Sequence, residues 1–179
     1  VVFIGYSFGA LITLEALEDL VAAENAGYPV SPWQHRPGDT RLIFVGPAVR
    51  CDAFSPRGKY RKTLACVDRV SLTINSRDDA LRFFHLLDTR TKVDALGCTG
   101  MPRRWMPSEI RYSAIDARNI IGREHGLTLY LRSNTLMQRI CGEAYGGLEN
   151  LSHETVLKKN QEHFLYCHAP VRHVFDLFK

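Results

Sequence analysis

Four short runs of apolar residues, separated by longer amphipathic or polar stretches, organise this sequence. The first two runs are continuously apolar, a pattern typical of strands that are covered on both faces of a sheet. The third run alternates between apolar and polar positions, which also indicates a strand. The predicted strands span residues 1–5, 42–45, 70–74 and 110–115.

Helical spacing of apolar residues appears between these runs. Directly after the first run, Ala10, Leu14 and Leu17 fall on one face of a helix, while Glu15 and Asp19 fall elsewhere. Helices are predicted over residues 8–23, 59–67 and 78–87, and a longer helical pattern follows residue 125 until two glycines interrupt it at 146–147. Loops are predicted at 24–40 and 88–109, where glycine and proline gather.

Strands that alternate with helices predict an α/β fold, with a mostly parallel sheet, right-handed crossovers and helices on both faces. We expect one core domain over residues 1–145. The tail, 146–179, is predicted to be partly helical and packed on the same domain. Because the chain opens without Met and already within an apolar strand, we expect strands N-terminal to it to be missing.

Composition narrows the function classes. Of the 179 residues, 45% are hydrophobic and 23% charged, which is typical of a globular protein, and the net charge is +4. No apolar run approaches the ~20 residues of a membrane span, and no nucleic-acid-binding motif is present. The basic clusters at 57–62 and 103–104 are interpreted as solvated loops, the alternative being contacts with an anionic substrate. The five cysteines include no C-x-x-C pair, which favours a reducing compartment and hence the cytoplasm.

The strongest chemical signal is Gly5-Tyr-Ser-Phe-Gly9, a G-x-S-x-G motif. A predicted strand ends directly before it and an amphipathic helix begins directly after it, as a nucleophile elbow requires. The sharp turn leaves room only for small neighbours of Ser7, and we expect Gly5 and Gly9 to provide that room. Such a turn presents the serine hydroxyl at the carboxyl edge of a parallel sheet, where ligands bind.

The stretch from Val1 to Leu11 resembles the fifth strand, elbow and following helix of the α/β-hydrolase superfamily, and the resemblance extends over about residues 1–145. It implies that the chain is the C-terminal part of that fold. The segment Leu96–Gly100, with Ile115-Asp116 ahead of His125, also resembles more loosely a poorly characterised bacterial branch of hydrolases. The family order is nucleophile, acid, histidine, with the acid after the second strand beyond the elbow and the histidine after the third.

The resemblance implies a catalytic triad of Ser7, Asp78 and His125. His125 lies between Gly122 and Gly126 in a predicted loop, where an imidazole is free to reach a serine. A serine hydroxyl needs such a base, and the base needs a carboxylate to hold its tautomer. Asp79 remains the alternative acid.

Other candidates were weighed against this triad. Asp52 follows the preceding strand and is a third choice for the acid. His85 is predicted to pack on a helix, and His35 precedes any suitable strand. The remaining histidines lie in the tail, where the i,i+4 pair His163 and Cys167 supplies two metal ligands, which do not make a site. We therefore expect neither a metal nor a cofactor.

The predicted reaction is cleavage of a small-molecule ester or thioester through an acyl-enzyme, as in carboxylesterases, lipases and thioesterases. The backbone N–H of Phe8 is the expected first donor of the oxyanion hole, and the second is expected from a loop outside the chain, so the chain alone should turn over esters poorly. Four side chains of the predicted loops are candidates to roof an apolar acyl pocket, with simple packing as the alternative, namely Trp33, Met101, Trp105 and Met106. The alternatives are a catalytically inactive interaction module or an inactive fragment of a hydrolase. A nucleotide-binding domain is disfavoured because both glycine-rich phosphate motifs are missing.

Overall fold

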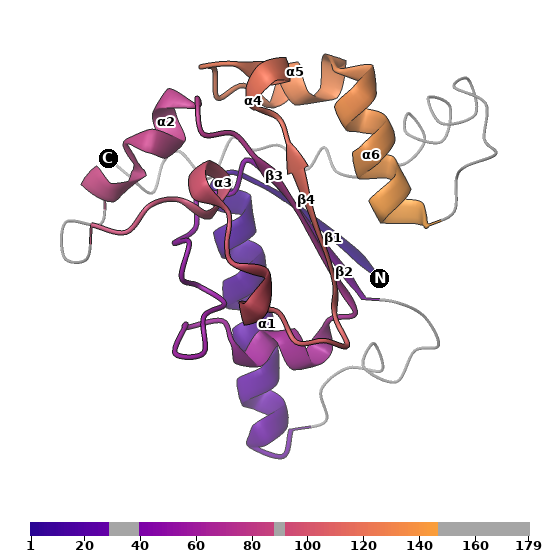
Figure 1. The fold of residues 1–179 in the computed structure, drawn as a ribbon. Helices are drawn as coiled ribbons and strands as arrows, with labels where there is room; N and C mark the ends of the chain where they lie inside the picture. The colour runs from indigo at the N-terminus through magenta and orange to yellow at the C-terminus, as the bar shows by residue number, and fades with distance from the viewer. Residues whose placement is uncertain (29–39, 88–91, 147–179) are drawn as a thin grey trace, which may run out of the picture. The chain divides into compact units, whose positions relative to one another are not determined.

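A computed structural model describes residues 1–28, 40–87 and 92–146. Its centre is a four-stranded, fully parallel sheet in which the strands are neighbours in chain order, β1-β2-β3-β4 (Figure 1). The strands are β1 Val2–Tyr6, β2 Arg41–Val45, β3 Arg69–Ile74 and β4 Arg111–Asp116. The predicted α/β class and parallel sheet are confirmed, and each strand lies within one or two residues of its predicted bounds.

The register brings the carboxyl ends of the strands to one edge of the sheet. Tyr6 pairs with Val45, and Ile74 pairs with Asp116. The residues that directly follow the strands therefore start their loops side by side, at the end of the sheet near which α2, α4 and α5 are seen in Figure 1.

Both faces of the sheet are covered, as the alternation of β2 illustrates. Leu42 and Phe44 belong to one buried cluster, whereas Ile43 and Val45 belong to another. The first cluster includes residues of α1 (Phe8–Asn25), η2 (Lys62–Cys66) and α3 (Leu96–Thr99). The second includes residues of α4 (Arg118–Ile121), α5 (Leu127–Arg132) and α6 (Asn134–Tyr145).

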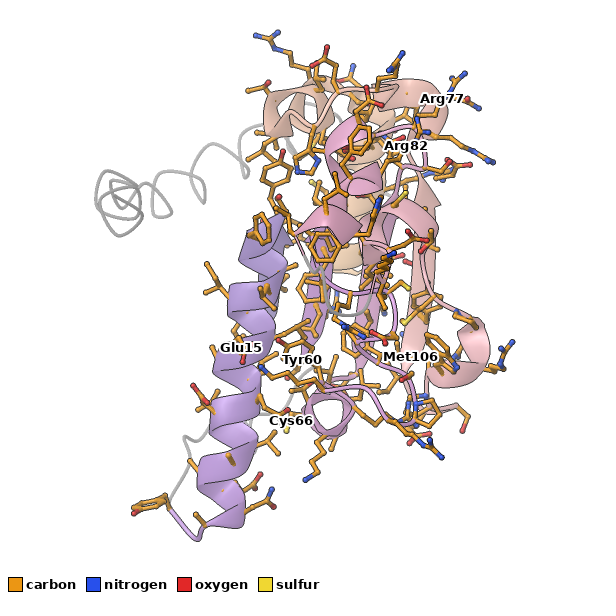
Figure 2. The ribbon with its side chains drawn as sticks, turned by 90° about the vertical axis from the view of Figure 1, so that its left-hand side faces the viewer. Glu15, Tyr60, Cys66, Arg77, Arg82 and Met106 are labelled. Atoms are coloured by element: carbon orange, nitrogen blue, oxygen red, sulfur yellow. The ribbon has the colours of Figure 1, made fainter. Side chains whose placement is uncertain are left out.

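Helix α1 follows its predicted pattern closely. Its buried residues are Ala10, Leu14, Leu17 and Val21, which recur at helical spacing and face the sheet. Tyr60 is buried in the same cluster, and its hydroxyl donates a 2.5 Å hydrogen bond to the Glu15 carboxylate of α1, a pair that Figure 2 shows side by side.

The predicted helix over 59–67 is wrong, because only a 3₁₀ segment forms, at Lys62–Cys66. The preceding amides are already used in turns: Tyr60 N–H donates to the Ala53 carbonyl, and Arg61 N–H donates to the Gly58 carbonyl. These bonds close a loop instead of starting a helix. The apolar residues of the segment pack against the core from this compact turn.

Two other predicted helices are each divided. The segment 78–87 forms a one-turn α2 (Asp79–Arg82) and a 3₁₀ segment η3 (Phe84–Leu86). The helical pattern after residue 125 is interrupted at Ser133, whose backbone is extended. The hydroxyl of Ser133 accepts the N–H of Leu136, so it caps α6 and separates it from α5.

The predicted loop at 88–109 contains α3 and a 3₁₀ segment, η4 (Arg103–Trp105). Met101 and Met106 are buried in the first core cluster and Trp105 packs against it, so these side chains have the packing role that was the alternative to a pocket roof. In Figure 2, Met106 lies far from Arg77 and Arg82, which follow β3 and mark the end of the sheet where the carboxyl ends of the strands lie. Trp33 lies outside the described residues.

The chain forms two compact units, Val1–Ala144 and Tyr145–Lys179. The first holds the sheet and the helices that cover it. Of the second, only the last residue of α6 and Gly146 are described, so the predicted helical tail lies outside the described residues. Within the part of the chain that the structure describes, no helix has the length and apolar character needed to cross a bilayer.

Candidate active site

Ser7 sits at the sharp turn between β1 and α1. Its backbone has φ 52° and ψ −122°, a left-handed conformation that is strained for a residue with a side chain. The surrounding backbone holds this turn, because Ser7 N–H donates to the Val45 carbonyl and the Ser7 carbonyl accepts the N–H of Ala48. Although Ser7 precedes α1 directly, its hydroxyl makes no capping bond to the helix and is left to other partners.

The two glycines of the motif differ in their surroundings. A Cβ at Gly5 would lie 2.7 Å from Ala10 Cα and 2.8 Å from Ala10 N, both backbone atoms of α1. A Cβ at Gly9 would meet nothing within 4 Å outside its own helix. The expectation that both glycines make room for the elbow therefore holds for Gly5, whereas Gly9 is not sterically required.

Asp78 follows β3 and caps the short helix α2. Its Oδ1 accepts the N–H of Leu81 at 3.1 Å, and the residue is completely buried. A buried carboxylate needs partners for both oxygens. The second oxygen, Oδ2, lies 2.7 Å from Nδ1 of His125.

His125 lies in the loop between α4 and α5 and joins the acid to the serine. While Nδ1 contacts Asp78, Nε2 lies 2.9 Å from Ser7 Oγ. The three side chains thus form one continuous chain of hydrogen bonds, contributed by the segments after β1, β3 and β4. Nδ1 donates to the acid in the tautomer that leaves Nε2 free to accept a proton from Ser7.

The alternative acids have other partners. The Asp79 carboxylate lies 2.9 Å from the Arg123 guanidinium and 3.6 Å from that of Arg82, at the surface. Asp52 pairs with Arg50 at 2.7 Å, and its side chain is 38% exposed. The structure therefore brings Asp78, and not Asp79 or Asp52, to His125.

Phe8 begins α1 directly after Ser7. The N–H groups of the first helical turn have no acceptor within their own helix, and they lie at the positive end of the helix dipole. The Phe8 amide therefore has the right place to receive negative charge that develops next to Ser7. The Phe8 side chain is 48% exposed, and its ring lies 6.4 Å from the ring of Phe84 in η3.

Sequence reasoning missed two tyrosines beside the imidazole. The Tyr6 ring stacks on His125 with 5.3 Å between centroids and 25° between planes. Burial, and then the charge of Asp78, raises the pKa of Tyr6. The same two causes raise the pKa of the fully buried Tyr130 to about 12.

The Tyr130 hydroxyl faces the side chains of Thr73 and Asn75 but makes no hydrogen bond of normal geometry with the described residues.

Asn75, which follows β3 directly, was also missed. It is buried, and its side-chain N–H donates to the carbonyl of Gly122 at 2.8 Å, while its Oδ1 accepts the N–H of Arg77. It thereby ties the segment that bears the acid to the segment that leads to His125. A buried polar residue at the end of an apolar strand is the signal that could have identified it.

The remaining candidates lie apart from this cluster or outside the described residues. His85 is in η3, where its Nδ1 lies 2.9 Å from the Arg82 carbonyl. His35, His163 and Cys167 are not described. Among residues 1–28, 40–87 and 92–146, no group of three or more side chains is arranged to hold a metal ion.

Comparisons with protein-family models, with curated proteins and with solved structures found no match to this chain. Assignment to the α/β-hydrolase superfamily therefore stays a prediction from the motif and the order of the site residues.

Proposed function

We propose that this protein is a serine hydrolase of the α/β-hydrolase type, which cleaves a small ester or thioester through an acyl-enzyme. The observation that carries the proposal is the unbroken chain of hydrogen bonds from Asp78 through His125 to Ser7. The strained backbone of Ser7 at the start of an 18-residue helix supports it, because structures retain such strain mainly where it serves function.

In the proposed mechanism, Ser7 Oγ attacks the substrate carbonyl while His125 Nε2 takes the hydroxyl proton. The Phe8 amide stabilises the negative charge on the carbonyl oxygen. His125 then gives the proton to the leaving alkoxide or thiolate, which departs as the alcohol or thiol and leaves the acyl group on Ser7. Water, activated by the same imidazole, hydrolyses this ester and restores the enzyme. Asp78 stabilises the imidazolium that forms in both steps.

The surroundings of Ser7 favour an apolar acyl group. The exposed ring of Phe8 directly follows the nucleophile, and the ring of Phe84 lies beside it. Apolar surface of this kind next to a reactive group is suited to bind a hydrocarbon substituent, because burial of ~30 Å² of it gains just under 1 kcal/mol. We therefore include short- to medium-chain acyl esters in the proposed substrate class.

The test is covalent labelling with a fluorophosphonate, which reacts with serines that a base activates. Wild-type protein should be labelled at Ser7, and Ser7→Ala and His125→Ala should lose the labelling. The exposed Ser108, whose hydroxyl donates to the Glu109 carboxylate, provides the control variant Ser108→Ala, which should label normally. With p-nitrophenyl butyrate, removal of Ser7 or His125 should lower kcat by about 10⁴- to 10⁶-fold. Labelling that persists in Ser7→Ala, or none in the wild type, would contradict the proposal and favour an interaction module.

A further inference from the structure

Tyr6 occupies a special place in the site, because it is the last residue of β1 and immediately precedes Ser7. Its side chain packs against the second core cluster, on the face of the sheet that α5 and α6 cover. Its ring stacks on His125, and the ring of Tyr130 meets it edge-on with 6.5 Å between centroids and 63° between planes. The Tyr6 ring thus packs against two other rings, the imidazole of His125 and the phenol of Tyr130.

The Tyr6 hydroxyl fixes the backbone that carries the imidazole. It donates a hydrogen bond to the carbonyl of His125, and the backbone N–H of Leu127 faces the same hydroxyl. Leu127 is the first residue of α5, so its N–H has no acceptor within that helix. The hydroxyl therefore satisfies the backbone acceptor of His125 and ties the last residue of β1 to the residue that carries the imidazole.

The stacked ring supplies a restraint that the other two contacts do not. Hydrogen bonds from Nδ1 to Asp78 and from Nε2 to Ser7 hold two points of the imidazole. A planar ring held at two points can still tilt about the line that joins them. The Tyr6 ring lies nearly parallel to the imidazole, at 25°, and blocks this tilt from one side.

We propose that Tyr6 is a positioning residue for the hydrolase proposed above: it holds His125 in line with Ser7 through ring stacking and through the hydrogen bond from its hydroxyl to the His125 carbonyl. The inference rests on the proposed function, because it assigns a role relative to the base of that reaction. It makes the residue before the nucleophile part of the support for the base, although 119 positions separate the two in the chain.

The experiment compares Tyr6→Phe, which keeps the stacked ring, with Tyr6→Leu, which loses both the ring and the hydroxyl. Tyr112 of β4 is also a partly buried strand tyrosine, but it packs against the other core cluster. The matched control is therefore Tyr112→Leu. Rates are divided by the number of active sites, which is measured as the amount of fluorophosphonate bound at completion of labelling. A loss of folded protein then does not count as a loss of kcat.

We expect Tyr6→Phe to lower kcat roughly fivefold and Tyr6→Leu roughly 50-fold, with KM within about twofold of wild type, as for the loss of one and then two moderate interactions. Tyr112→Leu should leave kcat per site unchanged even if it lowers stability. A merely structural role for Tyr6 would lower the number of active sites and leave kcat per site unchanged, and that result would overturn the inference. Should Tyr6→Leu fail to fold, the Tyr6→Phe rate decides in the same way.

A second readout separates this inference from the proposed function. In NMR spectra of histidine-labelled protein, the Cε1–H signal of His125 should lose its ring-current shift and broaden in Tyr6→Leu, and it should not change in Tyr112→Leu. If wild-type protein does not label at Ser7, the proposed hydrolase fails, and these spectra still show whether Tyr6 holds the imidazole. An unchanged His125 signal in Tyr6→Leu would overturn the role of Tyr6 whatever the activity.

Discussion

Replacement of the two motif glycines by alanine should have opposite effects. A Cβ at Gly5 would lie 2.7 Å from the Cα of Ala10, and an ordinary contact begins at 3.4 Å. Both contacting atoms are backbone, so β1 and the start of α1 must separate by about 0.7 Å. A shift of this size at Ser7 would lengthen its 2.9 Å contact with His125 to about 3.6 Å, beyond the range of a hydrogen bond.

The expected magnitudes follow from this displacement. Gly5→Ala should lose about 1–3 kcal/mol of stability through overpacking, and its kcat should fall by up to about 10²-fold because the nucleophile is misplaced. Gly9→Ala places its methyl group in open space on a helix. It should gain up to about 1 kcal/mol, since alanine is the better helix former, and keep kcat within about twofold.

The assay combines urea unfolding with the rate of p-nitrophenyl butyrate hydrolysis per labelled site. The midpoint of unfolding reports stability, and the labelled fraction counts sites with an activated serine. If Gly9→Ala were as damaging as Gly5→Ala, a contact that the structure lacks would constrain Gly9. A neutral Gly5→Ala would refute the reasoning altogether, because the turn would then be free to move away from the helix.

Two further outcomes are expected. Asp78→Asn should lower kcat by about 10⁴-fold, because it favours the wrong imidazole tautomer. Asp79→Asn loses only exposed ion pairs, so it should change kcat less than twofold and the free energy of unfolding by under ~1 kcal/mol. Steady-state kinetics and urea unfolding measure the two effects, and equal effects on kcat would contradict the assignment of Asp78 as the acid. The pKa of Tyr130 is raised from 10.0 to about 12, so the folded state binds more protons than the unfolded state between these pH values, and stability should fall as the pH rises through that window. Tyr130→Phe should make the free energy of unfolding fall less steeply with pH, by up to about 1.4 kcal/mol per pH unit. Urea unfolding between pH 9 and pH 11 measures this slope. An unchanged slope in the variant would contradict the burial of the phenol.

The sheet could be predicted because its strands are short, apolar and separated by clear loop signals. The position of the site could be predicted for a related reason. In a parallel sheet, the segments that follow successive strands meet at one edge, so Ser7, Asp78 and His125, which the resemblance to the α/β-hydrolase superfamily implies as a triad, were expected to lie close together. The small helices were less predictable. The segment 59–67 has helical spacing, but the amides of Tyr60 and Arg61 bond to the carbonyls of Ala53 and Gly58 in the preceding turns, and the apolar spacing gives no signal of these turns.

The choice between Asp78 and Asp79 could not be made from the pattern of residues, because both acids lie at the start of a predicted helix. The backbone decides it. Asp78 is in the extended conformation that precedes α2, with φ −63° and ψ 113°, and its side chain is directed inward to cap Leu81. Asp79 is already helical and its carboxylate reaches Arg123 at the surface. The two adjacent positions at the start of α2 thus direct one carboxylate into the interior and the other to the solvent.

Tyr6 escaped prediction for a different reason. It is one of the two variable positions of the motif, and nothing in its local sequence indicates a partner. Its contacts are with His125 and Tyr130, which follow the strand at the opposite edge of the sheet. A role that exists only through long-range packing leaves no periodic signal for sequence reasoning to use.

The geometry between acid and base depends on backbone contacts between their loops. Asn75 donates its side-chain N–H to the carbonyl of Gly122, and Asp79 donates its backbone N–H to the carbonyl of Arg123 at 3.0 Å. These bonds hold the segment after β3 against the segment that leads to His125, and so set the distance at which Asp78 meets the imidazole. Asp79 contributes to this arrangement through its amide, which every residue except proline has. Its carboxylate is therefore replaceable, whereas the buried side chain of Asn75 supplies a bond that no backbone group can replace.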